Sequence, residues 1–176
     1  GYDQTMTAEI RFVRALQYYL LMDGWGNIPF AKDIEKPVQI DRKAAYDWIE
    51  KELLEIEPQM SDAKAKKSTD AGYGRADKAA AWFLLMRLYL NAEVYTGTPQ
   101  WEKAAEYAKK VMTSSYRLNT KGVGAWTPYQ MLFMGDNGET DAAYEAVLPL
   151  FADGITTTQY GCSEFLIAST FDADMH

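Results

Sequence analysis

Apolar residues recur at helical spacing in four stretches of the chain, and this pattern predicts four main helices. The first stretch, residues 7–22, carries one apolar stripe made up of Ile10, Val13, Leu16 and Leu20. Thr7 stands at its start, where a hydroxyl caps the first turn of a helix. The second stretch, residues 41–59, begins at a capping Asp41, and Pro58 ends it or follows its end. Its predicted buried face is made up of Ala45, Ile49, Leu53 and Ile56.

The third and fourth stretches differ in how much of their surface is apolar. Residues 74–95 are apolar nearly all round, which is typical of a helix packed on several sides, so we expect this helix to be central. Its two apolar sides are made up of Ala79, Phe83, Met86 and Leu90, and of Trp82, Leu85 and Tyr89. The fourth stretch follows Thr98, with Pro99 at the first helical position. It carries at helical spacing Trp101, Ala104, Ala105, Ala108, Val111 and Met112.

The spacing within the last two stretches resembles a tetratricopeptide repeat. The matching positions are Trp82, Leu85 and Tyr89 in the first helix of the motif and Trp101 and Ala104 in its second. Beyond about Tyr116, glycine, asparagine and proline interrupt any period. We therefore predict a mainly α fold of tetratricopeptide-like helical hairpins, with a scaffold in residues 1–117 and a loop-rich region packed on it in residues 118–176.

The sequence LMDGWGNIPF, at the exit of the first helix, places Trp25 between two glycines. Gly24 suits the left-handed residue that ends a helix, and an apolar residue just beyond it commonly packs back on the last turn. The alternative is that Trp25 is a platform for a sugar ring. We interpret the stretch as architecture.

Composition excludes several classes of partner and of chemistry. The 176 residues suffice for one domain, and their formal net charge of -7 disfavours nucleic acid and anionic lipid, which reward basic patches. No run of about 18 apolar residues indicates a membrane span. Cys162 and His176 lack an orienting partner for thiol catalysis, and no other catalytic motif occurs, so we predict that the protein is not an enzyme. The chain opens at Gly1 without a leader, which we interpret as a piece of a longer protein.

Aromatic residues in the loop-rich part are the candidates for binding sugar. An aromatic ring stacks on the apolar face of a pyranose, while amides and carboxylates bind its hydroxyls. Trp126, Tyr129 and Tyr160 lie in loops that contain glycine, threonine and glutamine. The alternative for each is that it packs its loop onto the helices.

The acidic loop DNGETD contains enough oxygen ligands for calcium, with carboxylates at Asp136, Glu139 and Asp141. Its spacing is not that of an EF-hand, and such sequences commonly form solvated turns, which is the interpretation we favour. No other cofactor is indicated.

Four stretches in this order resemble the SusD/RagB family of outer-membrane glycan-uptake lipoproteins. They are AEIRFVRALQYYLLMDGWGNIPF, GRADKAAAWFLLMRLYLNAEVY, WEKAAEYAKKVMTSSYRL and YQMLFMGDNGETDAAYEAVLPL. The resemblance covers nearly the whole chain. It implies a SusD-like α-α superhelix in a surface-exposed, lipid-anchored protein that hands oligosaccharide to a SusC-like TonB-dependent porin.

The first functional hypothesis is therefore non-enzymatic glycan binding at the outer membrane, with delivery of a starch-like polysaccharide or oligosaccharide to a transporter. The second is a helical-repeat scaffold that binds a peptide or protein in its groove. The third is a glycoside-processing enzyme, whose paired carboxylates would be brought together only by folding.

Overall fold

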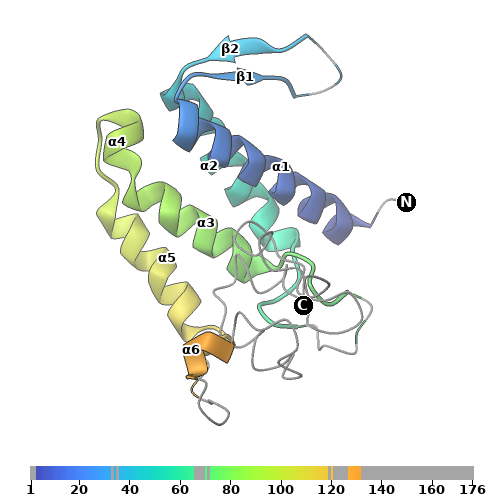
Figure 1. Cartoon of the computed structure of the whole chain (residues 1–176). Helices are drawn as coiled ribbons and strands as arrows, with labels where there is room; N and C mark the ends of the chain where they lie inside the picture. The colour runs from blue at the N-terminus through green and yellow to red at the C-terminus, as the bar shows by residue number, and fades with distance from the viewer. Residues whose placement is uncertain are drawn as a thin grey trace. The chain divides into compact units, whose positions relative to one another are not determined.

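The computed structural model describes residues 3–32, 34, 36–65, 70, 72–118, 120 and 127–131. Its elements, in chain order, are α1 (Gln4–Trp25), β1 (Ile28–Phe30), β2 (Val38–Ile40), α2 (Arg42–Ile56), the 3-10 turn η1 (Glu57–Gln59), α3 (Lys78–Leu90), α4 (Ala92–Thr96), α5 (Trp101–Thr113) and α6 (Pro128–Met131). The predicted mainly α class is confirmed (Figure 1). No helix among these residues is long and apolar enough to cross a membrane.

The chain forms two compact units. The first contains the described residues up to Met60 together with Leu84–Ala108, and the second contains Ser61–Phe83 and the described residues from Lys109 onward. The predicted division into residues 1–117 and 118–176 stays a prediction, because most residues after 118 lie outside the described part of the chain.

In the first unit, α1 and α2 pack side by side and are joined by a short antiparallel hairpin (Figure 1). Ile28 pairs with Ile40 and Phe30 with Val38. The Tyr18 hydroxyl ties the end of the first strand to α1, since it donates to the Ala31 carbonyl at 2.9 Å and accepts from the Ala31 amide at 3.1 Å. These strands were not predicted, because three residues are too few for an alternating pattern to be counted.

The predicted start and buried stripe of the first helix are both partly wrong. Asp3, not Thr7, caps α1, with Oδ1 accepting from the Thr5 amide at 2.9 Å. Ile10 and Val13 are 69% and 43% exposed. The face packed in the core is made up of Ala8, Phe12, Ala15, Leu16, Tyr19 and Met22. This face combines large aromatic area with small residues that admit a neighbouring helix, and α1 is apolar on so much of its circumference that periodicity does not select the face.

The second helix is confirmed in its cap, its face and its end. Oδ1 of Asp41 accepts from the Ala44 amide at 2.7 Å, which satisfies one of the free donors of the first turn. The buried side chains include all four predicted ones, Ala45, Ile49, Leu53 and Ile56. The α-helix ends at Ile56, and Pro58 lies in the 3-10 turn that follows.

The third predicted helix begins later than expected and is divided in two. Gly74 has φ +81 and lies before the helix, which starts at Lys78. The helix also breaks at Asn91, so that the predicted stretch ends as the short α4, which Gly97 terminates in the left-handed conformation. The buried apolar side chains of α3 are Ala79, Ala80, Ala81, Phe83, Leu84, Leu85, Leu88 and Tyr89, whereas Leu90 is exposed.

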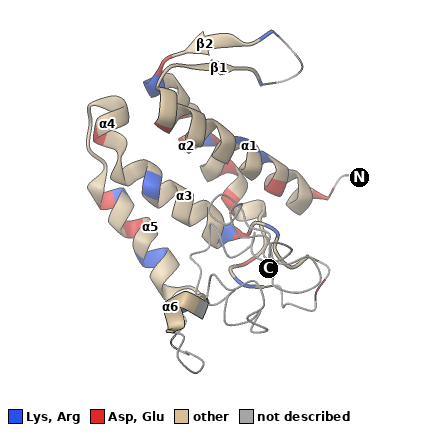
Figure 2. Ribbon diagram, viewed as in Figure 1, with Lys and Arg blue, Asp and Glu red and all other residues tan. Residues whose placement is uncertain are grey.

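The fourth predicted helix begins at Trp101, so Pro99 precedes it instead of occupying its first position. Ala104 and Val111 are buried as expected, but Trp101 is 61% exposed. Within the first unit the ring of Tyr107 on α5 lies 5.6 Å from the ring of Tyr89 on α3, which pairs the two helices as the predicted hairpin requires. Lysines and glutamates are interspersed along α5 (Figure 2).

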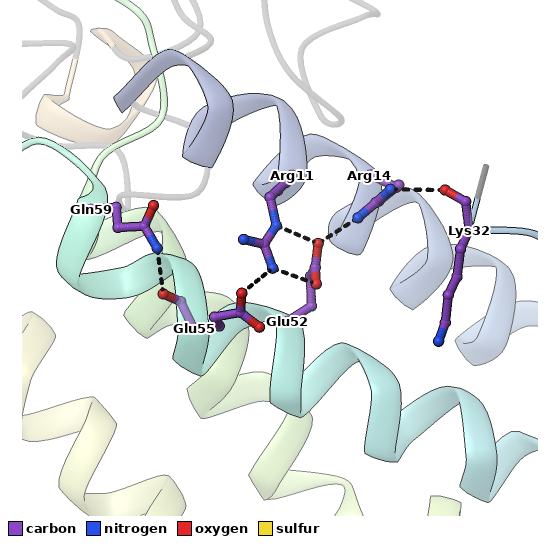
Figure 3. Close-up of polar contacts among 6 residues, drawn as sticks. All are labelled: Arg11, Arg14, Lys32, Glu52, Glu55 and Gln59. Carbon is purple, nitrogen blue, oxygen red and sulfur yellow. Dashed lines mark hydrogen bonds and ion pairs between the residues drawn. The ribbon is translucent and has the colours of Figure 1, made fainter. Parts of the chain in front are cut away.

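A carboxylate between α1 and α2 is the centre of a polar cluster in the first unit (Figure 3). Glu52 is buried and accepts from Nε and Nη2 of Arg11 at 2.8 and 2.9 Å, and from Nη2 of Arg14 at 2.6 Å. Arg11 also pairs with Glu55 at 3.0 Å, and Nη1 of Arg14 donates to the Lys32 carbonyl. Burial alone would raise the pKa of Glu52, but the hydrogen bonds and charges of the two arginines outweigh it and lower this pKa.

The predicted packing of Trp25 is wrong. Gly24 continues the helix, α1 ends at Trp25, and the residue with positive φ is Gly26, at φ 78 and ψ -90. The Trp25 side chain is 74% exposed, so it does not pack back on the last turn. Either of the two glycines that flank Trp25 could end the helix, and the sequence pattern indicated the wrong one.

The two glycines provide a matched test of this helix end. A Cβ built on Gly26 would lie 3.1 Å from Nη2 of Arg42, whereas a Cβ on Gly24 meets nothing within 4 Å. We expect Gly26→Ala to lower the free energy of unfolding by about 1–2 kcal/mol through backbone strain. Gly24→Ala should raise it by about 0.5–1 kcal/mol through helix propensity. Urea denaturation measures both, and equal effects would contradict the assigned end.

Candidate functional site

A cleft in the second unit combines an aromatic side chain with charged and hydroxyl groups. Its volume is about 450 Å³, within the range of sites that bind small molecules. The lining residues are Asp62, Ala63, Trp82, Lys110, Thr113, Ser114, Ser115 and Arg117. They come from the loop after η1, from the first half of α3, and from the end of α5 with the residues that follow it.

Trp82 supplies the large apolar surface of the cleft. It is partly buried and packs against a cluster formed by Ala79 and Tyr116, which Ala63 and Tyr73 also contact. Ala79 lies three residues before Trp82 on α3, so the two side chains share one face of the helix. The indole is therefore held by packing on one side while it lines the cleft.

The walls of the cleft are joined by one buried carboxylate, Asp77. Its Oδ1 accepts from the amides of Ala79 and Ala80 at 2.8 and 3.1 Å, as the cap of α3. Its Oδ2 accepts from the Lys64 amide and from the Tyr116 hydroxyl, both at 2.8 Å. Burial raises the pKa of Asp77, and these hydrogen bonds limit the rise because they favour the charged form.

Charged groups form the rim. Lys78 contacts Oδ1 of Asp62 at 2.6 Å, and its hydrogen bond and charge lower the pKa of that carboxyl. Nη1 of Arg117 donates to the carbonyl oxygens of Ser114 and Tyr116, which holds the guanidinium beside the end of α5. Lys110 adds a second cation to the lining. An indole with a carboxylate and a guanidinium nearby can take up a ring with one apolar face and polar edges.

Comparison with known proteins identifies the chain. The starch-binding protein SusD of Bacteroides thetaiotaomicron is 43% identical to it over 171 residues, which are 96% of this chain. The chain belongs to the SusD family. It spans 29% of the length of that SusD. No protein-family model matches the chain.

Solved SusD-like structures share the fold. A SusD-like carbohydrate-binding protein of Bacteroides fragilis NCTC 9343 matches 77% of this chain and 25% of its own, with a TM-score of 0.62 and 23% identity. A second SusD-like protein of the same strain also matches 77% of this chain and 25% of its own, with a TM-score of 0.58 and 21% identity. At these identities both confirm the fold of this SusD-family chain.

Most binding residues predicted from the sequence lie outside the described part of this SusD-family chain. Trp126 and Tyr160 belong to this group, as do the candidate calcium ligands Asp136, Glu139 and Asp141. Tyr129 is described: it lies on α6 and its side chain is 70% exposed. All six assignments stay predictions. Among the described residues, no group of His, Cys, Asp and Glu side chains could hold a metal ion.

The residues of the cleft were not predicted as a site. Trp82 was assigned to the apolar surface of a central helix. Lys110 and Arg117 lie 28 and 35 positions beyond Trp82 in the chain, too far for a local pattern to connect them. The sequence feature that could have indicated the cleft is Trp82, because the polar N–H of tryptophan makes it less common than leucine on a fully buried helix face.

Proposed function

We propose that this protein binds glycan at the cell surface and delivers it to a TonB-dependent transporter of the outer membrane. The observation that carries the proposal is the 43% identity, over 96% of the chain, to a protein named for binding starch. A SusD-like carbohydrate-binding protein has the same fold, and both are named as binding proteins, which supports a non-enzymatic role.

The proposed ligand is a starch-like polysaccharide or its oligosaccharides, and the proposed partner is a SusC-like porin. A lipid anchor would hold the protein at the outer membrane. Trp126, Tyr129 and Tyr160 are proposed to stack on sugar rings in this assembly, and Asp136, Glu139 and Asp141 are the candidate ligands for calcium. The net charge of -7 agrees with a neutral glycan as ligand, since no basic surface is needed to hold it.

Titration calorimetry on the full-length protein tests the glycan. We expect heat of binding with maltohexaose, an α-1,4-linked glucose hexamer, and little or none with the β-1,4-linked cellohexaose. The combined Trp126→Ala, Tyr129→Ala and Tyr160→Ala variant should bind maltohexaose at least about tenfold more weakly, because each stacking contact contributes roughly 0.5–1.5 kcal/mol. Absence of binding to any of a panel of neutral oligosaccharides would overturn the proposed function and favour the peptide-binding scaffold.

A further inference from the structure

We propose that the cleft around Trp82 is itself a sugar-binding site, separate from the loop aromatics, that takes up the end or a branch of a neutral pyranose oligosaccharide. This inference rests on the proposed function for its class of ligand. It is carried by the arrangement of the described residues, namely a partly buried indole, a carboxylate and a guanidinium on one cleft of about 450 Å³.

The first step of the argument is the indole. Sugar rings bind best to aromatic faces that are already ordered, because ordering a free side chain on binding costs conformational entropy. Packing against Ala79 and Tyr116 orders Trp82 before any ligand arrives. Other large aromatics of the described residues, such as Trp25 and Trp101, are much more exposed and do not line this cleft.

The second step is the hydrogen-bonding capacity of the rim. Lys78 contacts only Oδ1 of Asp62, and a carboxylate has acceptor sites on both oxygens, so this side chain keeps capacity for sugar hydroxyl donors. The hydrogen bonds of Arg117 to the chain use Nη1, and a guanidinium has five N–H donors. Acceptor and donor therefore line the same cleft as the indole, and the hydroxyls of one sugar can use both.

The third step is the rigidity of the walls. The loop carrying Asp62 and Ala63, the start of α3 and the segment at Tyr116 all attach to Asp77 through hydrogen bonds of 2.8–3.1 Å. A cleft whose walls share one buried anchor keeps its shape without ligand, which is typical of sites that bind small molecules.

Fluorine NMR of the full-length protein labelled with 5-fluorotryptophan tests the cleft directly. The signals of Trp82 and Trp101 are assigned from Trp82→Phe and Trp101→Phe. On titration with maltohexaose we expect the Trp82 signal to shift in a saturable manner, while the Trp101 signal, from a tryptophan on α5 outside the cleft lining, stays in place. A Trp82 signal that does not move while calorimetry shows maltohexaose bound elsewhere would overturn this inference and leave the proposed function intact.

A rim variant separates direct binding from a distant effect. Asp62 and Arg117 are exposed, so the combined Asp62→Ala and Arg117→Ala change should leave the fold intact. We expect the affinity for maltohexaose, measured from the Trp82 signal, to fall by about tenfold, because two hydrogen bonds to the sugar are lost. A Trp82 titration unchanged in this variant would also overturn the inference. No calorimetric binding to any neutral oligosaccharide would overturn the proposed function and the cleft together.

Discussion

Replacing Asp77 with alanine is expected to lower the free energy of unfolding by about 3–4 kcal/mol, the largest effect of any single change considered. The substitution removes the carboxylate that accepts from the amides of Lys64 and Ala79 and from the Tyr116 hydroxyl, at a side chain that is 4% exposed. The Ala80 amide keeps the Asp77 carbonyl oxygen as an acceptor at 3.1 Å. Each buried donor left without a partner costs about 1–3 kcal/mol, and local relaxation recovers part of the sum.

Amide hydrogen exchange in the full-length protein distinguishes local destabilisation around Asp77 from destabilisation of the whole protein. The amides of Lys64 and Ala79 should lose protection in Asp77→Ala, whereas the amides in the middle of α2, in the first unit, should keep theirs. Asp77→Asn should cost less, because its carbonyl oxygen can still accept from Ala79 and Ala80. The matched control is Asp62→Ala, which removes an exposed carboxylate whose surface ion pair contributes little to stability. Equal losses in the two alanine variants would contradict the anchoring role of Asp77.

The second large effect is expected at Glu52. Glu52→Gln keeps the shape of the side chain but removes the charge that both Arg11 and Arg14 contact. Glu55 then remains as the carboxylate partner of Arg11, and Arg14 still donates to the Lys32 carbonyl (Figure 3). We expect a loss of about 2–3 kcal/mol near pH 7, because two partly buried cations lose their shared partner.

The loss of stability caused by Glu52→Gln should become smaller as the pH falls. The pKa of Glu52 lies below its ordinary value of 4.5 in the folded state, so the unfolded chain binds the proton more readily. The stabilisation by Glu52 is therefore complete above the unfolded pKa and disappears as the pH falls through the folded pKa. Urea unfolding of wild type and Glu52→Gln should give a difference that is constant near neutrality and shrinks below about pH 4.5.

An exposed pair is the control for this pH dependence. Lys43 and Asp47 lie 2.6 Å apart on α2 with both side chains more than half exposed, so Asp47→Asn should cost no more than about 0.5 kcal/mol. A Glu52→Gln difference that persists unchanged at pH 3 would show that the side chain acts through packing and not through its charge.

The two proposed sugar sites were inferred from different observations. The aromatics at Trp126, Tyr129 and Tyr160 were chosen because loops place such residues at ligands, whereas Trp82 was found because the folded chain brings Asp62 and Arg117 beside it. Binding at both would allow one protein to hold a long polysaccharide at two points, which raises the apparent affinity without new contacts at either site.

Local chemistry made several elements readable from the sequence alone. The α2 helix was predicted with its Asp41 cap, its buried stripe and its end near Pro58, because each depends only on residues within a few positions of one another. The order of four family-like stretches likewise predicted the SusD family, since a linear pattern needs no folding to be read.

Only the tertiary structure decided which helix face is buried and which residue ends a helix, where the sequence allowed several alternatives. Apolar residues surround most of α1, and packing in the core selected Phe12 and Tyr19 over Ile10 and Val13. Two glycines could end that helix, and the close approach of Arg42 accompanies the turn at Gly26. The cleft is decided in the same way. Asp62, Trp82 and Arg117 are far apart in the chain, and hydrogen bonds to the buried Asp77 help to join the segments that carry them, which no periodicity within one segment can reveal.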